Sequence, residues 1–160
     1  MASGWVKTDP DPFLRAPNLS SRGYNSLREG SMISSRCGEQ PPGALLEGIA
    51  LFNAGEYFEC HEVLEAIWRA ESDSVRALYQ GILQIGVAYY HLHRGNWRGA
   101  VKLLDGGIDK VSRFLPGCMG VDTLALVQAA RACLALLHEL GHERVDEFDW
   151  SLIPTIKMTG

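Results

Sequence analysis

The sequence predicts an all-α fold, a compact bundle of about five helices. Between residues 43 and 140, apolar residues recur every three or four positions, which is the spacing of one buried helix face. Glycine, proline and short polar segments interrupt this pattern and mark the turns between helices. The length of 160 residues suits one domain with a hydrophobic core and is too short for two.

Capping and breaking residues mark the ends of each helix. Pro42 precedes the first helix, Glu56 suits the positive N-terminal end of the second, and Asp73 or Ser74 can cap the third. Gly141 follows the last turn of the fifth. The expected ranges are 43–52, 56–69, 74–94, 97–115 and 123–140.

Two helices have distinctive compositions. The third is apolar on most of its circumference, so we expect it at the centre of the bundle, with the narrow polar stripe that contains Gln80, Gln84 and His91 at least half buried. The fourth contains Gly106 and Gly107, which cost helix stability of about 1 kcal/mol each relative to alanine. This pair indicates a close approach of two helices or a bend.

The two ends of the chain differ from the middle. Residues 1–41 are rich in Ser, Gly, Pro, Asn and Arg without sustained periodicity, so we expect a flexible N-terminal tail. Residues 42–141 are expected to form the bundle. Residues 142–160, which include Phe148 and Trp150, are expected to form a tail that packs on the bundle with its aromatic side chains.

Composition excludes several classes of function. The net charge is −4 and no basic run occurs, so we expect neither a nucleic-acid partner nor an anionic membrane partner. No apolar run approaches the roughly 20 residues that a membrane span needs. Four cysteines without a Cys-x-x-Cys pair argue against a zinc finger. We expect a cytoplasmic protein with reduced thiols, and Cys60 and Cys133 in the core.

The densest chemistry lies in residues 52–69, on the second predicted helix. His61, Glu65 and Trp68 fall together at the edge of its apolar face, while Glu62 lies further round, near Arg69. A group at the border between core and water is partly desolvated, so its pKa can shift. The helix is therefore the predicted site of function.

This region resembles a known family. The motif reads Phe-Asn-x-Gly-Glu-Tyr-Phe-Glu-x-His-Glu-x-x-Glu-x-x-Trp, and Gln80-Gly81-Ile82, Tyr90-His91 and Gly95-Asn96 follow it. It resembles the all-helical domain-of-unknown-function 309 family, over roughly residues 44–115. The resemblance implies a small helical protein without an established function, although some members are labelled metal-dependent hydrolases. A faint internal repeat also resembles tetratricopeptide helical hairpins.

Three interpretations of the motif remain open. The first is a buried polar network that fixes helix register, in which Glu65 accepts from His61 or Arg76. The second is a site for an unknown small molecule or protein. The third is a divalent metal site for hydrolysis, with His61, Glu65 and His91 as candidate ligands and Glu62 and Glu65 as candidate catalytic groups. The candidate binding residues are His61, Glu65, Trp68, Gln80, Gln84 and His91.

No complete catalytic set accompanies the motif. Cys60 is adjacent to His61 in sequence but faces the core, and no glycine-rich phosphate loop occurs. We therefore expect a binding or scaffold module, with a metal-dependent hydrolase as the alternative. Tyrosines and tryptophans near the motif would make a homodimer unsurprising.

Overall fold

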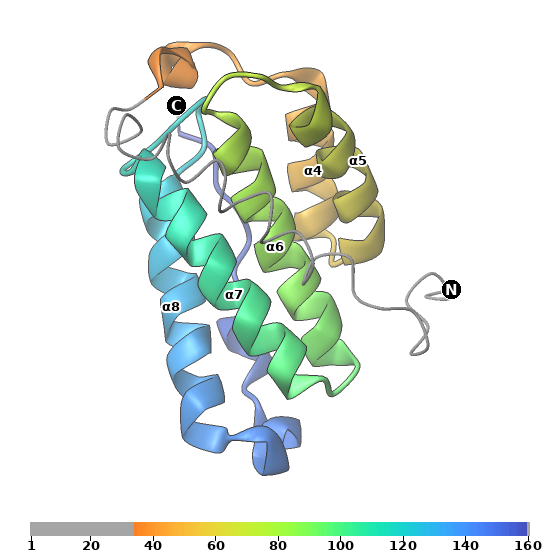
Figure 1. The fold of residues 1–160 in the computed structure, drawn as a ribbon. Helices are drawn as coiled ribbons and strands as arrows, with labels where there is room; N and C mark the ends of the chain where they lie inside the picture. The colour runs from red at the N-terminus through yellow and green to blue at the C-terminus, as the bar shows by residue number, and fades with distance from the viewer. Residues whose placement is uncertain (1–33, 160) are drawn as a thin grey trace. The chain divides into compact units, whose positions relative to one another are not determined.

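The computed structural model describes residues 34–159 and confirms an all-α compact bundle (Figure 1). The described α-helices are α4 (Gly43–Asn53), α5 (Tyr57–Ala70), α6 (Arg76–His93), α7 (Trp97–Val111) and α8 (Thr123–Leu140). Short 3-10 helices flank them, namely η3 (Ser35–Gly38), η4 (Ser112–Phe114), η5 (His142–Glu147) and η6 (Trp150–Leu152). The fourth helix ends earlier than predicted because residues 112–114 tighten into a 3-10 turn. The tetratricopeptide-like geometry stays a prediction.

Helix α6 lies at the centre of the described bundle. Figure 1 shows α4 and α5 on one side of it and α7 and α8 on the other. Every residue from Leu78 to Leu92 is buried, including the polar stripe. The prediction of a central third helix is confirmed, because a helix with apolar residues around most of its circumference needs neighbours on most sides.

Glycines bring α6 and α7 into close contact. A β-carbon on Gly107 would lie 2.8 Å from the carbonyl oxygen of Gly81, and one on Gly81 would lie 3.1 Å from the carbonyl oxygen of Gly107. No larger residue fits at either position without moving a backbone. The predicted close approach at Gly107 is therefore confirmed.

Residues 34–39, which we call the N-terminal strap, are attached to the bundle by specific contacts. The Ser34 hydroxyl donates to Asp73 at 2.7 Å, and the Arg36 guanidinium meets the Glu71 carboxylate at 2.6 Å. These two acids lie in the α5–α6 loop. The strap therefore belongs to the folded unit, and the flexible tail that we expected for residues 1–41 cannot extend to residue 41. The remainder of that expectation, residues 1–33, lies outside the described residues.

A disulfide joins the strap to the loop between α7 and α8. Cys37 and Cys118 are bonded across 81 positions of sequence, and the backbone N–H of Met119 donates to the Cys37 carbonyl at 2.7 Å. The expectation of reduced thiols is therefore wrong for this pair, because residues so distant in sequence showed no spacing signal. Cys60 and Cys133 are free and buried, as predicted.

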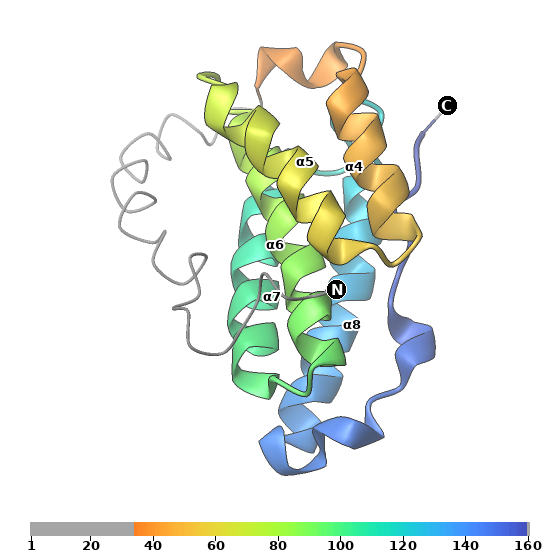
Figure 2. The ribbon, with the colours of Figure 1, turned by 90° about the vertical axis from the view of Figure 1, so that its right-hand side faces the viewer.

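The C-terminal segment comprises residues 142–159. Its first part, η5, contacts α7 and α8, and the rest runs along the bundle on the side away from α7 (Figure 2). The side-chain amide of Asn53 donates to the Ile156 carbonyl at 3.0 Å, and its oxygen accepts from the Ile156 N–H at 2.7 Å. Phe148 and Ile156 are buried, whereas Trp150 is 42% exposed. Asn53 thus ties the end of α4 to the end of the chain.

Helix α8 is long and apolar enough to cross a membrane by length and composition alone, with a mean hydropathy of 1.3. Its inward residues Leu126, Ala130 and Cys133 are buried against the bundle. Core helices of proteins without membrane spans have the same composition. The helix therefore carries no conclusion about a membrane.

Candidate functional site

One edge of α5 carries the residues that the sequence singled out. His61, Glu65 and Trp68 follow one another at intervals of about one turn, beside the buried residues Cys60 and Leu64. We call these three residues the α5 stripe. The apolar face of α5 packs on α4 and α6, which leaves the stripe at the border of the core, as predicted.

Hydrogen bonds link the stripe along the helix. His61 Nε2 lies 3.0 Å from Glu65 Oε1, and the Arg69 guanidinium donates to Glu65 Oε2 at 2.6 and 3.0 Å. Burial lowers the pKa of His61, although the Glu65 carboxylate acts in the opposite direction. The imidazole is therefore neutral near pH 7, and its Nε2–H donates to the carboxylate.

Of the two donors expected for Glu65, the structure confirms His61. Its second partner is Arg69 and not Arg76. The spacing of four residues between Glu65 and Arg69 is a sequence signal for this pair. Glu62 is exposed and lies outside the chain of hydrogen bonds.

Trp68 connects the α5 stripe to α6. The guanidinium groups of Arg69 and Arg76 lie 5.6 and 5.2 Å from the centre of its ring, within the range of cation–π attraction. Arg76 is the first residue of α6. The indole Nε1 is buried and has no hydrogen-bond partner among residues 34–159. A buried N–H without an acceptor is uncommon in folded proteins.

A second polar stripe runs along α6. Gln80, Gln84 and His91 are all buried, and we call them the α6 stripe. The amide oxygen of Gln84 points at α7, where a β-carbon on Gly106 would lie 3.2 Å from it. This oxygen is buried and accepts no hydrogen bond. The glycine therefore makes room for a polar group that the described residues do not satisfy.

His91 lies at the α7 end of the α6 stripe and takes part in the turn between the two helices. Its carbonyl accepts from the Asn96 N–H at 2.9 Å, and its Nδ1 lies 3.4 Å from Asn96 Nδ2. Asn96 in turn caps α7, because its side-chain oxygen accepts from the Gly99 N–H at 3.0 Å. His91 is thus close to the N-terminus of α7.

The two stripes do not assemble a set of metal ligands. Within residues 34–159, no three His, Cys, Asp or Glu side chains converge as a metal ion would need. His61 and Glu65 are in contact, while His91 interacts with Asn96. The polar groups of the two stripes are suited to hydrogen bonding. They include a neutral imidazole, a carboxylate, two amides and an indole N–H.

The region that contains both stripes is similar to a known protein family. Residues 45–103 match the family model of the domain of unknown function DUF309. The resemblance predicted from the motif is confirmed. The DUF309 match covers α5, α6 and nearly all of α4, and ends within α7, so it contains both stripes. The strap, α8 and the C-terminal segment lie outside it.

A curated relative gives the same picture. A segment of 69 residues is 39% identical to an uncharacterised protein, YpuF, of Bacillus subtilis (strain 168). The alignment covers 42% of this chain and 40% of that protein, so the chain spans less than half of the relative's length. Neither the DUF309 description nor the name of this relative assigns an activity.

Some functional contacts had no sequence signal. The pairing of Asn53 with Ile156 spans 103 positions, and nothing in either local pattern indicates it. The sequence also contains no indication that Trp68 Nε1 and Gln84 Oε1 lack partners among the described residues. Whether a polar atom is paired depends on how the chain packs and not on residue type.

Proposed function

We propose that this protein is a binding module and that the two stripes receive an extended segment of a partner protein. One observation carries the proposal: the buried Trp68 Nε1 and the buried Gln84 Oε1 both lack hydrogen-bond partners in the described part of the chain. Leaving a buried polar atom unpaired costs about 1–3 kcal/mol. A bound group that pairs with both atoms recovers this free energy.

The chemistry of the two atoms favours a polypeptide backbone. Trp68 offers an N–H donor and Gln84 a carbonyl acceptor. A peptide supplies a C=O and an N–H in every residue, so one extended segment can satisfy both atoms. Arg76 of α6 lies over the Trp68 ring, so the helix that carries Gln84 also contacts Trp68.

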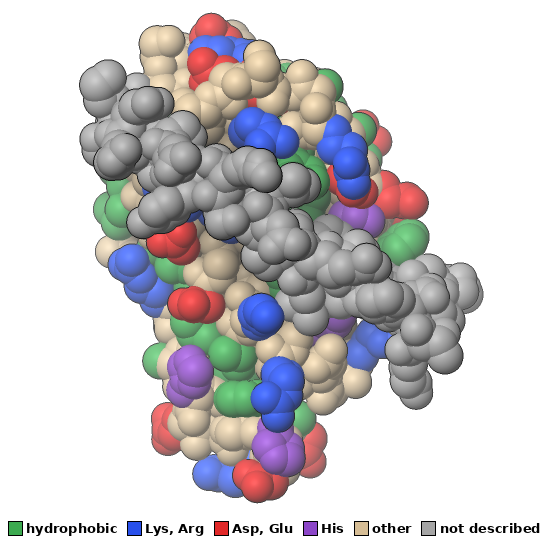
Figure 3. Space-filling model, viewed as in Figure 1, with side chains coloured by type: hydrophobic (Ala, Val, Ile, Leu, Met, Phe, Trp, Pro, Cys, Tyr) green, Lys and Arg blue, Asp and Glu red, His purple; other side chains and the backbone are tan. Residues whose placement is uncertain are grey.

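Charge around the stripes favours an acidic residue in the bound segment. Arg69 already compensates the Glu65 carboxylate, whereas Arg76 pairs only with the Trp68 ring and the Glu71 carbonyl oxygen among the described residues. Lys110 of α7 packs beside Gly81, next to Gln80. Arg76 and Lys110 thus place two basic residues near the Gln80 end of the α6 stripe, whereas basic and acidic side chains are interspersed over the described part of the face in Figure 3.

The test is selection of peptides from a random library displayed on phage, with the full-length protein as bait. We expect enriched sequences that contain an acidic residue. Gln84→Leu and Trp68→Phe should each lower the affinity for a selected peptide by about three- to tenfold, which is the effect of losing one hydrogen bond. Gln128→Leu, which changes an exposed glutamine on α8, is the matched control and should bind as the wild type does.

Stability measurements separate this proposal from a purely architectural role. Leucine is close to glutamine in size and removes an unpaired oxygen, so Gln84→Leu should unfold at the same temperature as the wild type or higher. A lower melting temperature, or selected peptides that bind both variants equally, would contradict the proposal.

The alternative function, a metal-dependent hydrolase, has its own measurement. The metal content of protein purified without chelator or affinity tag should be compared with that of His61→Ala. Near-stoichiometric metal that the variant loses would favour the hydrolase over the binding module.

A further inference from the structure

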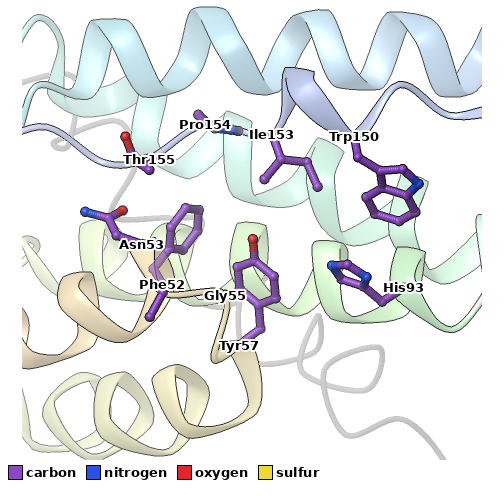
Figure 4. Close-up of a pocket in the computed structure, with 10 residues that line it drawn as sticks. Phe52, Asn53, Gly55, Tyr57, His93, Trp150, Ile153, Pro154 and Thr155 are labelled. Carbon is purple, nitrogen blue, oxygen red and sulfur yellow. The ribbon is translucent and has the colours of Figure 1, made fainter.

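A cavity of about 330 Å³ lies away from the two stripes. Three segments form its walls: the turn between α4 and α5, the last residue of α6, and the C-terminal segment (Figure 4). The part of the C-terminal segment that lines the cavity, residues 150–155, lies on the side of the bundle away from α7, whereas Gln84 faces α7. The cavity is therefore a second site, independent of the proposed peptide-binding function.

The walls of the cavity are held in place by bonds that do not use its interior. The two hydrogen bonds between Asn53 and Ile156 fix the C-terminal segment against α4. Gly55 has a φ of 79°, which lets the chain turn sharply into α5. A volume above about 300 Å³ is in the range of sites for small molecules.

Aromatic rings line much of the cavity. The Tyr57 and His93 rings are stacked with centres 6.1 Å apart, and His93 stacks on Trp150 at 4.5 Å. Phe52 meets Tyr57 edge to face at 5.5 Å. None of the lining residues is Asp, Glu, Lys or Arg. Such walls favour a flat, uncharged ligand, because an ion would lose hydration without gaining a partner.

One polar group is aimed into this cavity. Tyr57 is only 6% exposed, and its hydroxyl makes no hydrogen bond with the described residues. Figure 4 shows the hydroxyl pointing across the cavity toward the C-terminal segment. Burial raises the pKa of Tyr57 to about 12, so the hydroxyl keeps its proton at neutral pH. It is available as a donor to a ligand.

We infer that this cavity binds a small, neutral aromatic molecule whose carbonyl or similar oxygen accepts a hydrogen bond from Tyr57. The ring packs among Phe52, Tyr57 and Trp150, and the hydroxyl sets its orientation. Trp150 is partly exposed and stands at the rim, which gives the ligand a route in.

The test uses benzamide as the probe, with the full-length protein followed by NMR chemical shifts. We expect benzamide to shift signals of the lining residues. Tyr57→Phe, which keeps the ring, should weaken binding by about three- to tenfold. Trp150→Ala should weaken it further. Because Trp150 is only partly exposed, a melting curve of this variant checks that the fold is retained.

Two controls make the outcome decisive. Tyr79→Phe removes another buried tyrosine hydroxyl, one that contacts Met119 outside the cavity, and should not change the affinity. Cyclohexanecarboxamide keeps the amide of benzamide without its aromatic ring and should bind more weakly. The inference is overturned if benzamide causes no shifts, if Tyr57→Phe and Trp150→Ala bind it as the wild type does, or if both amides bind equally.

Discussion

Burial determines whether the contact between His61 and Glu65 is an ion pair or a hydrogen bond of a neutral ring. Because burial lowers the pKa of His61, the pair is a hydrogen bond from a neutral ring and not an ion pair at neutral pH. Arg69 supplies the positive charge that Glu65 needs. These residues therefore stabilise a fixed arrangement along α5. The proposed binding function rests instead on Trp68 Nε1 and Gln84 Oε1, which have no hydrogen-bond partner among the described residues.

The neutral His61 predicts a pH dependence of stability. The unfolded histidine has a pKa near 6.5 and takes up a proton before the folded one does. The free energy of unfolding should therefore fall as the pH drops through about 6.5, until the folded pKa is passed. Urea unfolding at pH values above and below this point measures the loss. The free energy of unfolding of His61→Gln should fall by less than that of the wild type over the same pH range.

The matched control for this experiment is His142→Gln, because His142 is exposed after the end of α8. It should follow the wild-type pH profile. If His61→Gln and the wild type lose the same free energy between the two pH values, His61 is not held neutral in the folded protein.

At the scale of whole elements, the crossing of α6 and α7 determines where the α6 stripe lies. Gly81 and Gly107 allow the two backbones to touch, and Gly106 gives the Gln84 side chain its room. Sequence periodicity predicted both helices, and the glycine pair predicted either a close helix approach or a bend. Which glycine meets which backbone atom depends on the angle between the helices, and periodicity does not contain that angle.

Gly107→Ala tests this crossing. The new β-carbon would lie 2.7 Å from Ile85 Cγ1 and 2.8 Å from the Gly81 carbonyl oxygen, so a backbone must move. We expect the free energy of unfolding to fall by about 1–3 kcal/mol, as for other overpacked cores. Chemical denaturation measures it.

Gly43→Ala provides the comparison, since a β-carbon there has no neighbour within 4 Å. This variant should stay within about 0.5 kcal/mol of the wild type. Equal stability of the two variants would show that α6 and α7 do not touch at Gly107.

At the scale of the whole described unit, the strap and the Cys37–Cys118 disulfide connect the N-terminal side of α4 to two loops of the bundle. The strap bonds to the α5–α6 loop through Ser34 and Arg36, and to the α7–α8 loop through the disulfide. Disulfides persist mainly in oxidising compartments. The redox state of this pair in the cell, which rapid alkylation of thiols measures, therefore tests the cytoplasmic location expected from composition: an oxidised pair argues against it.

Removing the disulfide should destabilise the protein. The bond closes a loop across 81 positions, and native disulfides of this kind contribute about 2–4 kcal/mol, chiefly by restricting the unfolded chain. The double variant Cys37→Ser, Cys118→Ser should melt at a lower temperature than the oxidised wild type. A reductant should lower the wild-type melting temperature and leave that of the double variant unchanged. An oxidised wild type that melts with the double variant would contradict the expectation.

The sequence by itself determined the helices, the central position of α6, the buried Cys60 and Cys133, and the α5 stripe. These features follow from helical periodicity, which is local and reads directly from residue spacing. Only the tertiary structure decided the Cys37–Cys118 bond, the Asn53–Ile156 hydrogen bonds, the cavity around Tyr57 and the unpaired atoms of Trp68 and Gln84. Each of these depends on how segments distant in sequence pack against one another, and residue spacing along the chain does not determine that packing.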